Sequence, residues 1–575
     1  MILQSLCEYY ERKPDLPRAG FETKGIPFVI EINSAGKFVQ FEDTRTLEGK
    51  KKVARKFVVP QGLKKSSGVA ANLLWGNTEY VLGITNDGDE KKVQHRHNAF
   101  QSKLSTVDNQ EDPGLSAVRT FLKSHNKADL KVDPLWQEIL TTKPDMTFRL
   151  QGDLVLVCQR PAIRDSLSKA TTNEITCLIS GELDGISDAN GKPDGLHWAI
   201  KGVWGAQSSG ANIVSFNKDA FNSFRKTQGA NASVGKRVAF AYTTALNYLL
   251  SKDSVQRIQV GDASTVFWSE KQTSLEGAFA DLFNDPPKDD PAKQTRAVEA
   301  LFKAPASGVL SSDDEGTSFY VLGLAPNAAR ISVRFWHVGT VTEMSARIRQ
   351  HFQDLTIIHA KFEKPYLSLF RLLVSIASQG KSENIPPNLS GEFMRAILSG
   401  RPYPQTMLQA ALRRVRAERE VTYSRAALIK ACLNTQERYS PSNEMEITVS
   451  LDDSNTNAGY RIGRLFATLE KVQEEASPNL NATIRDRFYG AASSTPVTVF
   501  ATLMKLKNHH LAKLAQERKR YFEKLIGRIT DGIDSNGFPA HLSLADQGRF
   551  TIGYYHQRQA FFTKTEPTAK GASLS

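Results

Sequence analysis

The hydrophobic periodicity of the sequence changes near residue 341, and this change limits the folds open to the chain. Before that point, segments with alternating apolar residues, such as Ile331, Val333 and Phe335, occur among segments with helical spacing. After it, apolar residues recur every three or four positions in most segments. The pattern predicts an α+β protein. A mixed N-terminal region with antiparallel strands is followed by a mostly helical region and a C-terminal helical bundle.

Three parts are predicted from these patterns and the breaks between them. A mixed α/β domain covers residues 1–345, a helical connecting region covers 346–444, and a helical bundle covers 445–575. The last boundary follows residues 439–443, a polar break that contains proline. A chain of 575 residues can bury more than one core.

The charge balance favours an anionic partner. The net charge is +13 and the isoelectric point is near 9.3, which suits nucleic acid but also an ordinary basic protein. A membrane partner is not expected, because no apolar segment is long enough to span a bilayer and no basic amphipathic end is present. Four scattered cysteines without a Cys-x-x-Cys pair argue against a zinc ribbon or disulfides. A cytoplasmic protein without a secretory leader is expected.

A basic cluster occupies residues 50–65, where seven cations occur without an acid. Runs of one charge are often a solvated face. Here, however, the run is followed by the small residues Ser66-Ser67-Gly68 and by Asn72, which can approach a DNA groove closely. The nucleic-acid-binding candidates in and after this cluster are Lys50, Lys51, Lys52, Arg55, Lys64, Lys65, Ser66, Ser67 and Asn72.

A second candidate surface lies between His197 and Ser251. Residues 198–204 resemble a strand, in which Trp198 and Trp204 are expected to be core residues. A glycine-bounded polar loop follows, and then cations and amides with few acids, which suits a polyanion passing main-chain N–H groups. The stretch ends in a helix with a 3.6-residue period. Its candidates, for which a helix-end or core-edge role is equally open, are Gln207, Ser208, Ser209, Asn212, Lys226, Lys236 and Arg237.

No catalytic or metal-binding motif stands out in the sequence. Glu182 and Asp184 resemble the carboxylate pair of a two-metal nuclease, but a turn at a strand end explains them better. The histidine pairs lack a second ligand pair at motif spacing; they are His95 with His97 and His509 with His510. We therefore expect no enzyme activity, no cofactor and no metal site.

Several strings, in this order along the chain, resemble the CRISPR-associated large subunit of type I-C Cascade (the Csd/Dvulg subtype). They are NLLWGNTEYVLG at 72–83, GAQSSGANIVSFN at 205–217, FYVLGLAPNAARISVRFW at 319–336 and GYRIGRLFATLE at 459–470. The start MILQSLCEYYERK and the string AFAYTTALNYLL add to the resemblance. The similarity runs from residue 1 to about 470 and rests on the number and order of the strings.

The resemblance implies a non-catalytic subunit of an RNA-guided antiviral complex. Such a subunit would sit at the crRNA 5′ end beside the backbone subunits, with a small subunit as a further partner. It would read the protospacer-adjacent motif (PAM) on double-stranded target DNA, support the R-loop and the displaced single strand, and recruit a helicase-nuclease. The resemblance implies that the N-terminal part senses the PAM, and our candidates for that task are Lys64, Lys65, Ser66, Ser67, Asn72 and Asn77.

The resemblance also implies a second product. Large subunits of this kind encode a small subunit by internal initiation, and Met445 begins the matching C-terminal part. Two other functions stay open on the sequence alone. One is a metal-dependent nuclease that uses Glu182, Asp184 and a histidine, and the other is a structural scaffold without DNA affinity of its own.

Overall fold

The computed structural model divides the chain into two compact units. The first contains residues 1–200 and 212–248, and the second contains residues 201–211 and 249–575. The described residues are 1–49, 51–62, 69–86, 88–107, 111–124, 127–167, 174–185, 197–216, 218–226, 228–307, 316–442, 444–478, 480–533 and 537–562.

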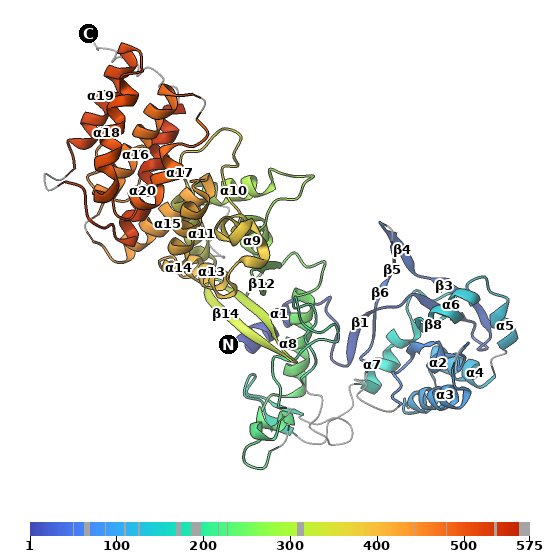
Figure 1. The fold of residues 1–575 in the computed structure, drawn as a ribbon. Helices are drawn as coiled ribbons and strands as arrows, with labels where there is room; N and C mark the ends of the chain where they lie inside the picture. Colours follow the sequence, from blue (N-terminus) through green and yellow to red (C-terminus); the bar gives the residue numbers. More distant parts are fainter. Residues whose placement is uncertain are drawn as a thin grey trace, which may run out of the picture. The chain divides into compact units, whose positions relative to one another are not determined.

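The first unit contains a four-stranded mixed sheet in the order β3-β2-β8-β7 (Figure 1). Its central pair, β2 and β8, is parallel, and the two outer pairings are antiparallel. Apolar residues of β2 and β8, among them Phe28, Ile30 and Phe148, are fully buried and pack with helix residues such as Phe121. The four strands are β2 (Phe28–Ile32), β3 (Phe38–Asp43), β7 (Trp75–Asn77) and β8 (Asp145–Leu150).

In the described part of this unit, three two-stranded antiparallel ribbons and eight α-helices accompany the sheet. The ribbons are β1 (Phe21–Gly25) with β6 (Lys56–Pro60), β4 (Arg45–Glu48) with β5 (Lys51–Ala54), and β9 (Glu174–Thr176) with β10 (Leu183–Gly185). The helices are α1 (Ile2–Arg12), α2 (Thr78–Val81), α3 (Glu90–Ser105), α4 (Pro113–Ser124), α5 (Lys127–Lys131), α6 (Trp136–Thr142), α7 (Pro161–Leu167) and α8 (Lys236–Leu249).

The second unit begins with an antiparallel sheet in the order β11-β12-β13-β14. A register shift between Gly323 and Leu324 bends β13, and a β-carbon added at Gly323 would overlap the ring of Phe335. Helices α9, α11 and α13 contact this sheet. The elements are β11 (Arg257–Val260), β12 (Ala263–Ser269), β13 (Ser318–Asn327), β14 (Arg330–Thr340), α9 (Ser274–Phe283), α10 (Lys293–Ser307), α11 (Val341–Leu355) and α13 (Pro387–Ser399).

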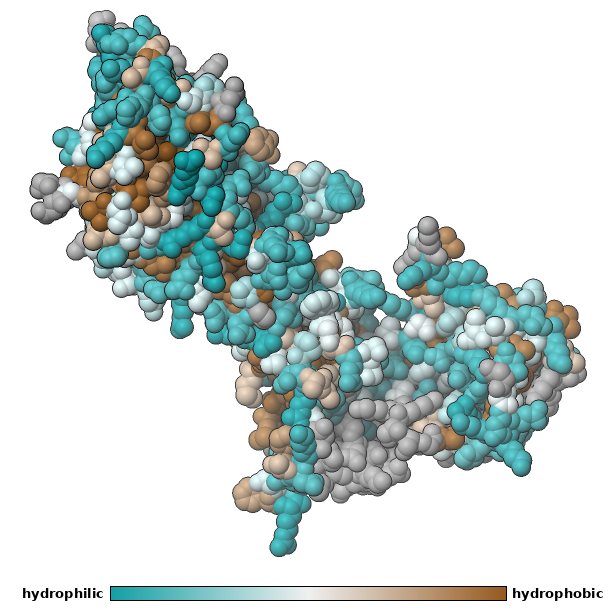
Figure 2. Space-filling model, viewed as in Figure 1, coloured by the Kyte–Doolittle hydropathy of each residue, from teal (hydrophilic) through white to brown (hydrophobic). Residues whose placement is uncertain are grey.

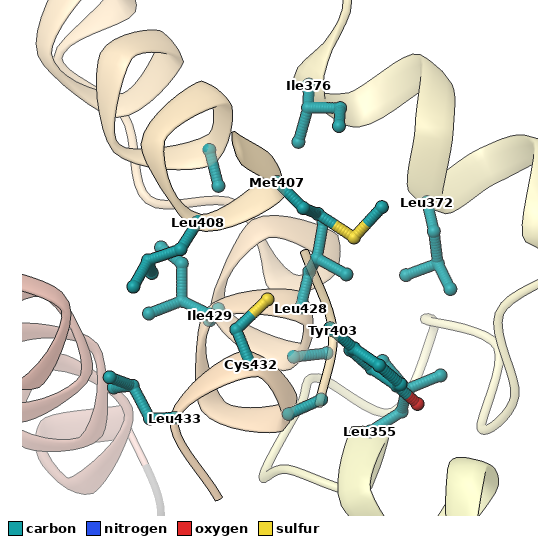
Figure 3. Close-up of a cluster of buried hydrophobic side chains, with 14 of the residues drawn as sticks. Leu355, Leu372, Ile376, Tyr403, Met407, Leu408, Leu428, Ile429, Cys432 and Leu433 are labelled. Carbon is teal, nitrogen blue, oxygen red and sulfur yellow. The ribbon is translucent and has the colours of Figure 1, made fainter. Parts of the chain in front are cut away.

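One continuous apolar core joins this sheet to the remaining helices. Figure 3 shows part of it, where Leu372, Met407 and Leu428 come from three different helices and lie on one side of Tyr403. The helices are α12 (Leu369–Ile376), α14 (Gln405–Glu418), α15 (Tyr423–Tyr439), α16 (Ala458–Ala476), α17 (Ile484–Ala492), α18 (Val497–Leu511), α19 (Gln516–Thr530) and α20 (Leu544–Phe562).

Helices α16 and α20 approach each other closely through glycines. A β-carbon added at Gly463 of α16 would overlap the carbonyl oxygen of Phe550 in α20, and one added at Gly553 of α20 would overlap that of Tyr460. Only glycine lets two backbones come this near. Most of the buried apolar residues of both helices belong to the continuous core, which also includes Ile429 of α15.

Two histidines in this core are held neutral by burial. His351 shares a 2.6 Å hydrogen bond with the hydroxyl of Tyr403, and His556 shares one of 2.9 Å with the hydroxyl of Tyr460. Burial lowers the pKa of each imidazole to about 3. Neither histidine faces a carboxylate that would favour the charged form enough to offset this burial.

The predicted α+β class is confirmed. The strands expected at 319–324 and 331–336 and the long helices expected after residue 341 are present. Residues 198–204 contain no strand, and only Ile200 forms an isolated bridge. The predicted boundaries after residues 345 and 444 both lie inside the second unit, and that division into three parts stays a prediction.

Replacing Gly463 with alanine is expected to lower the free energy of unfolding by about 1–3 kcal/mol, because the added methyl group forces the two backbones apart. Gly527 in α19 is a matched control, since a β-carbon there meets nothing within 4 Å. Gly527→Ala is expected to raise stability by about 0.4–1 kcal/mol. Urea denaturation of the full chain measures both changes, and equal effects at the two positions would contradict the close packing.

The buried histidines predict acid sensitivity of the second unit. In the unfolded chain they bind protons near pH 6.5, but in the folded chain they do so only near pH 3. The unfolded state therefore binds more protons between these values, and stability falls as the pH drops below about 6.5, by up to about 1.4 kcal/mol per pH unit for each histidine. Between pH 7 and 5, the free energy of unfolding should depend less steeply on pH for His351→Phe than for wild type; a dependence unaffected by His351→Phe contradicts this account.

Candidate nucleic-acid interface

The predicted basic cluster lies in part on the β4–β5 hairpin of the first unit. In the ladder Leu47 pairs with Lys52, and Lys51 and Lys52 are both exposed. Arg55 follows β5 directly, is exposed, and has its guanidinium 5.2 Å from the centre of the Phe57 ring. Figure 1 shows β4 and β5 as a ribbon that projects from the neighbouring strands. The hairpin thus presents three of the predicted cations to solvent.

Ion pairs of Arg45 fix the base of this hairpin. Arg45 pairs with Asp43 at 2.7 Å and with Glu138 at 2.5 Å, and its hydrogen bond lowers the pKa of the Asp43 carboxyl. Lys52 and Arg55, by contrast, form no ion pair within 4 Å with a described side chain, although the charge of Lys52 helps to lower the pKa of the Asp43 and Glu138 carboxyls. Lys51 lies opposite Glu48 in the ladder.

Two of the predicted asparagines have different surroundings. Asn77 ends β7 and caps α2, because its side-chain oxygen accepts a hydrogen bond of 3.3 Å from the backbone N–H of Tyr80. Asn72 is partly buried and has interaction partners within the protein. The base-reading roles of both stay predictions. The other predicted residues of this region lie outside the described residues; they are Lys50, Lys64, Lys65, Ser66 and Ser67.

The second predicted surface is divided between the two units. The loop with Gln207, Ser208 and Ser209 belongs to the second unit, where all three side chains are exposed and the N–H of Gly210 bonds the carbonyl of Gln207 at 2.9 Å. Trp204 in the same loop is 64% exposed, so its assignment to the core was wrong. The remaining candidates belong to the first unit; they are Asn212, Lys226, Lys236 and Arg237.

Residues at the start of α8 have structural partners. The exposed Arg237 pairs with Glu182 at 3.0 Å and with Asp184 at 3.6 Å, and its backbone N–H donates to Asp184 at 2.9 Å. The side chain of Asn212 donates to the carbonyl oxygen of His197 at 2.7 Å. The two carboxylates considered for a nuclease thus hold an arginine and a helix start. In the described part of the chain, no three His, Cys, Asp or Glu side chains gather as a metal site.

Sequence reasoning missed a row of cations on α19. Arg520, Lys524 and Arg528 follow one another at four-residue spacing, so they lie along one exposed face about one turn apart. Phe522 and Ile526 lie on the opposite, buried face. None of the three cations has an ion pair with a described residue. The four-residue spacing was the signal that sequence reasoning did not use. Figure 2 shows hydrophilic side chains interspersed with apolar ones over the visible face of the C-terminal helices.

A family model for CRISPR-associated proteins (Cas_Csd1) matches residues 6–562, which is nearly the whole chain. The chain therefore belongs to this family of CRISPR-associated proteins. Within that class it is a Csd1-type large subunit of the Cascade kind. No curated protein matches the chain. In the described segments, no helix combines the length and the apolar character needed to cross a membrane.

Asn77 offers a test that separates its helix-capping role from base reading. Asn77→Ala is expected to lower the free energy of unfolding by about 1 kcal/mol, whereas Asn77→Asp retains a capping oxygen and should keep wild-type stability in urea denaturation. An aspartate cannot donate a hydrogen bond to a base. Loss of preference for the correct PAM in the stable Asp variant would identify a base contact; retained preference would rule that contact out.

Proposed function

We propose that the chain is a non-catalytic large subunit of a type I-C Cascade complex. It binds PAM-containing duplex DNA, supports the R-loop and the displaced strand, and recruits the helicase-nuclease that degrades the target in antiviral defence. In this assembly it contacts the crRNA-bound backbone subunits and a small subunit. The complex contains RNA, and no membrane takes part.

The observation that carries this proposal is the β4–β5 hairpin, which exposes Lys51 and Lys52 together with the adjacent Arg55. A two-stranded ribbon has the width of the DNA major groove, and lysine and arginine side chains bind phosphates. The row Arg520, Lys524 and Arg528 is a second cationic surface, available to a DNA strand that leaves the duplex. Family membership supports a role within a Cas complex.

A metal-dependent nuclease is the alternative function. Its proposed ligands Glu182 and Asp184 both bind Arg237, which does not favour a second role in holding a divalent cation. Purified full-length protein with Mg²⁺ or Mn²⁺ is expected to leave labelled DNA intact. Cleavage that disappears in Glu182→Ala would support the nuclease and overturn the non-catalytic proposal.

The two cationic surfaces predict different defects in the assembled complex. Lys51→Ala with Lys52→Ala should weaken binding to all PAM-containing duplexes and reduce the salt dependence of the binding constant by about one per lost phosphate contact. Arg520→Ala with Lys524→Ala should leave duplex binding nearly unchanged and reduce R-loop yield, as seen by permanganate footprinting. Arg413→Ala, which removes one exposed cation outside both surfaces, serves as a control. Unchanged affinity and salt slope in the Lys51/Lys52 variant would refute the role of the hairpin.

A further inference from the structure

The loop of residues 218–226 in the first unit displays an aromatic side chain to solvent. All nine of its residues are exposed, and the side chain of Phe224 is 92% exposed. Phe221, in a short 3₁₀ turn of the same loop, is 36% exposed. A single exposed apolar residue needs no explanation by itself, so what marks Phe224 is the backbone that holds it and the charges around it.

The backbone of this loop is also held in an unusual conformation. Phe224 and Arg225 have φ values of 51° and 59°, and the N–H of Lys226 bonds the carbonyl of Ser223 at 2.9 Å. Positive φ at both central positions is the pattern of a type I′ turn, which normally takes Asn and Gly because other side chains are strained there. This chain instead places a large aromatic ring and a guanidinium at the two strained positions.

Asn231 braces the turn from the following segment. Its side-chain oxygen accepts a hydrogen bond of 2.9 Å from the N–H of Ser223, and its amide group donates to the carbonyl of Lys226 at 3.1 Å. The same amide group donates to the side chain of Asn222 at 3.3 Å. These bonds join both ends of the turn, so the ring of Phe224 is presented from a braced backbone despite its full exposure.

The charges around the ring indicate the chemistry of the partner. Lys218, Arg225 and Lys226 are exposed, and none has an ion pair with a described residue; Asp219 is the single acid of the loop. An exposed ring next to unpaired cations suits an unpaired nucleobase with its phosphates, because bases stack on aromatic rings and phosphates bind the cations.

We propose that Phe224 stacks on an unpaired base of a nucleic-acid strand, while Arg225 and Lys226 contact the adjoining phosphates. This inference rests on the proposed function, since it requires that the chain meets single-stranded DNA. It adds a specific base-stacking site to that function. Asn231 is a positioning residue, which acts by holding the turn.

The test uses the full-length chain and single-stranded DNA with 2-aminopurine, a base whose fluorescence is quenched by stacking. Wild type and Phe224→Trp should quench it. Phe224→Asn should lose the quenching and bind roughly five- to hundredfold more weakly, because one stacked base is lost. Since asparagine suits positive φ, the same variant should unfold at equal or higher urea concentration than wild type. Quenching by Phe224→Asn equal to that of wild type overturns the inference.

Leu154→Ala is the matched control, because Leu154 is a fully exposed apolar residue of the same unit outside the loop. It should bind and quench as wild type does, and a loss of quenching equal to that of Phe224→Asn would overturn the assignment to Phe224. The assembled complex with 2-aminopurine in the displaced strand separates the two proposals. R-loop formation without quenching at any position overturns the stacking site and leaves the proposed function intact. Absence of any DNA binding overturns both.

Discussion

The close contact between α16 and α20 is the constraint on which the second unit depends. Because glycines remove the side chains at the crossing, the two backbones come near enough for polar groups on both helices to meet in the interior. Glu470 of α16 is fully buried there, where it accepts hydrogen bonds from the hydroxyls of Tyr554 at 2.6 Å and Thr483 at 2.8 Å. Arg558 lies 3.8 Å from the same carboxylate. A buried carboxylate is tolerated only when hydrogen bonds and a nearby cation stabilise its charge. The spacing of the two helices and the interactions of Glu470 therefore depend on each other.

Much of this architecture could be predicted from the sequence because most of its helices are amphipathic. The apolar spacing of α16 and α19 and the alternation in β14 are visible in single segments. Helix α20 gives a weaker pattern because residues from Gly548 to Gln557 are buried all round, including Arg549 and His556. A helix enclosed on every side has no polar face, so periodicity does not mark it. The apolar residues 198–204 gave the opposite error. Their hydrophobicity indicated a buried strand, but whether a strand forms depends on the segments that lie beside it in the fold.

The candidate interface was less predictable than the fold. Exposure of Lys51, Lys52 and Arg55 followed from a run of cations without acids. The sequence did not indicate that Asp184, far from α8 along the chain, would accept a hydrogen bond from the backbone N–H of Arg237 at the start of that helix and pair with its guanidinium. Nor did it indicate that neighbouring parts of one polar stretch would belong to different units. Such features depend on contacts between distant segments, which local spacing does not record.

The continuous core has a consequence for the product predicted to begin at Met445. In the full chain, Gly548 of α20 lies against Leu433 and Ile429, and the side chain of Asn434 bonds both the N–H and the carbonyl of Ile447. A chain that starts at Met445 lacks the helices that supply these partners. Apolar residues of α20 would then be exposed on one side, and the N–H and carbonyl of Ile447 would lose their hydrogen-bond partner. Because burying this apolar surface is favourable, such a fragment would be more stable when bound to a neighbouring subunit than when alone.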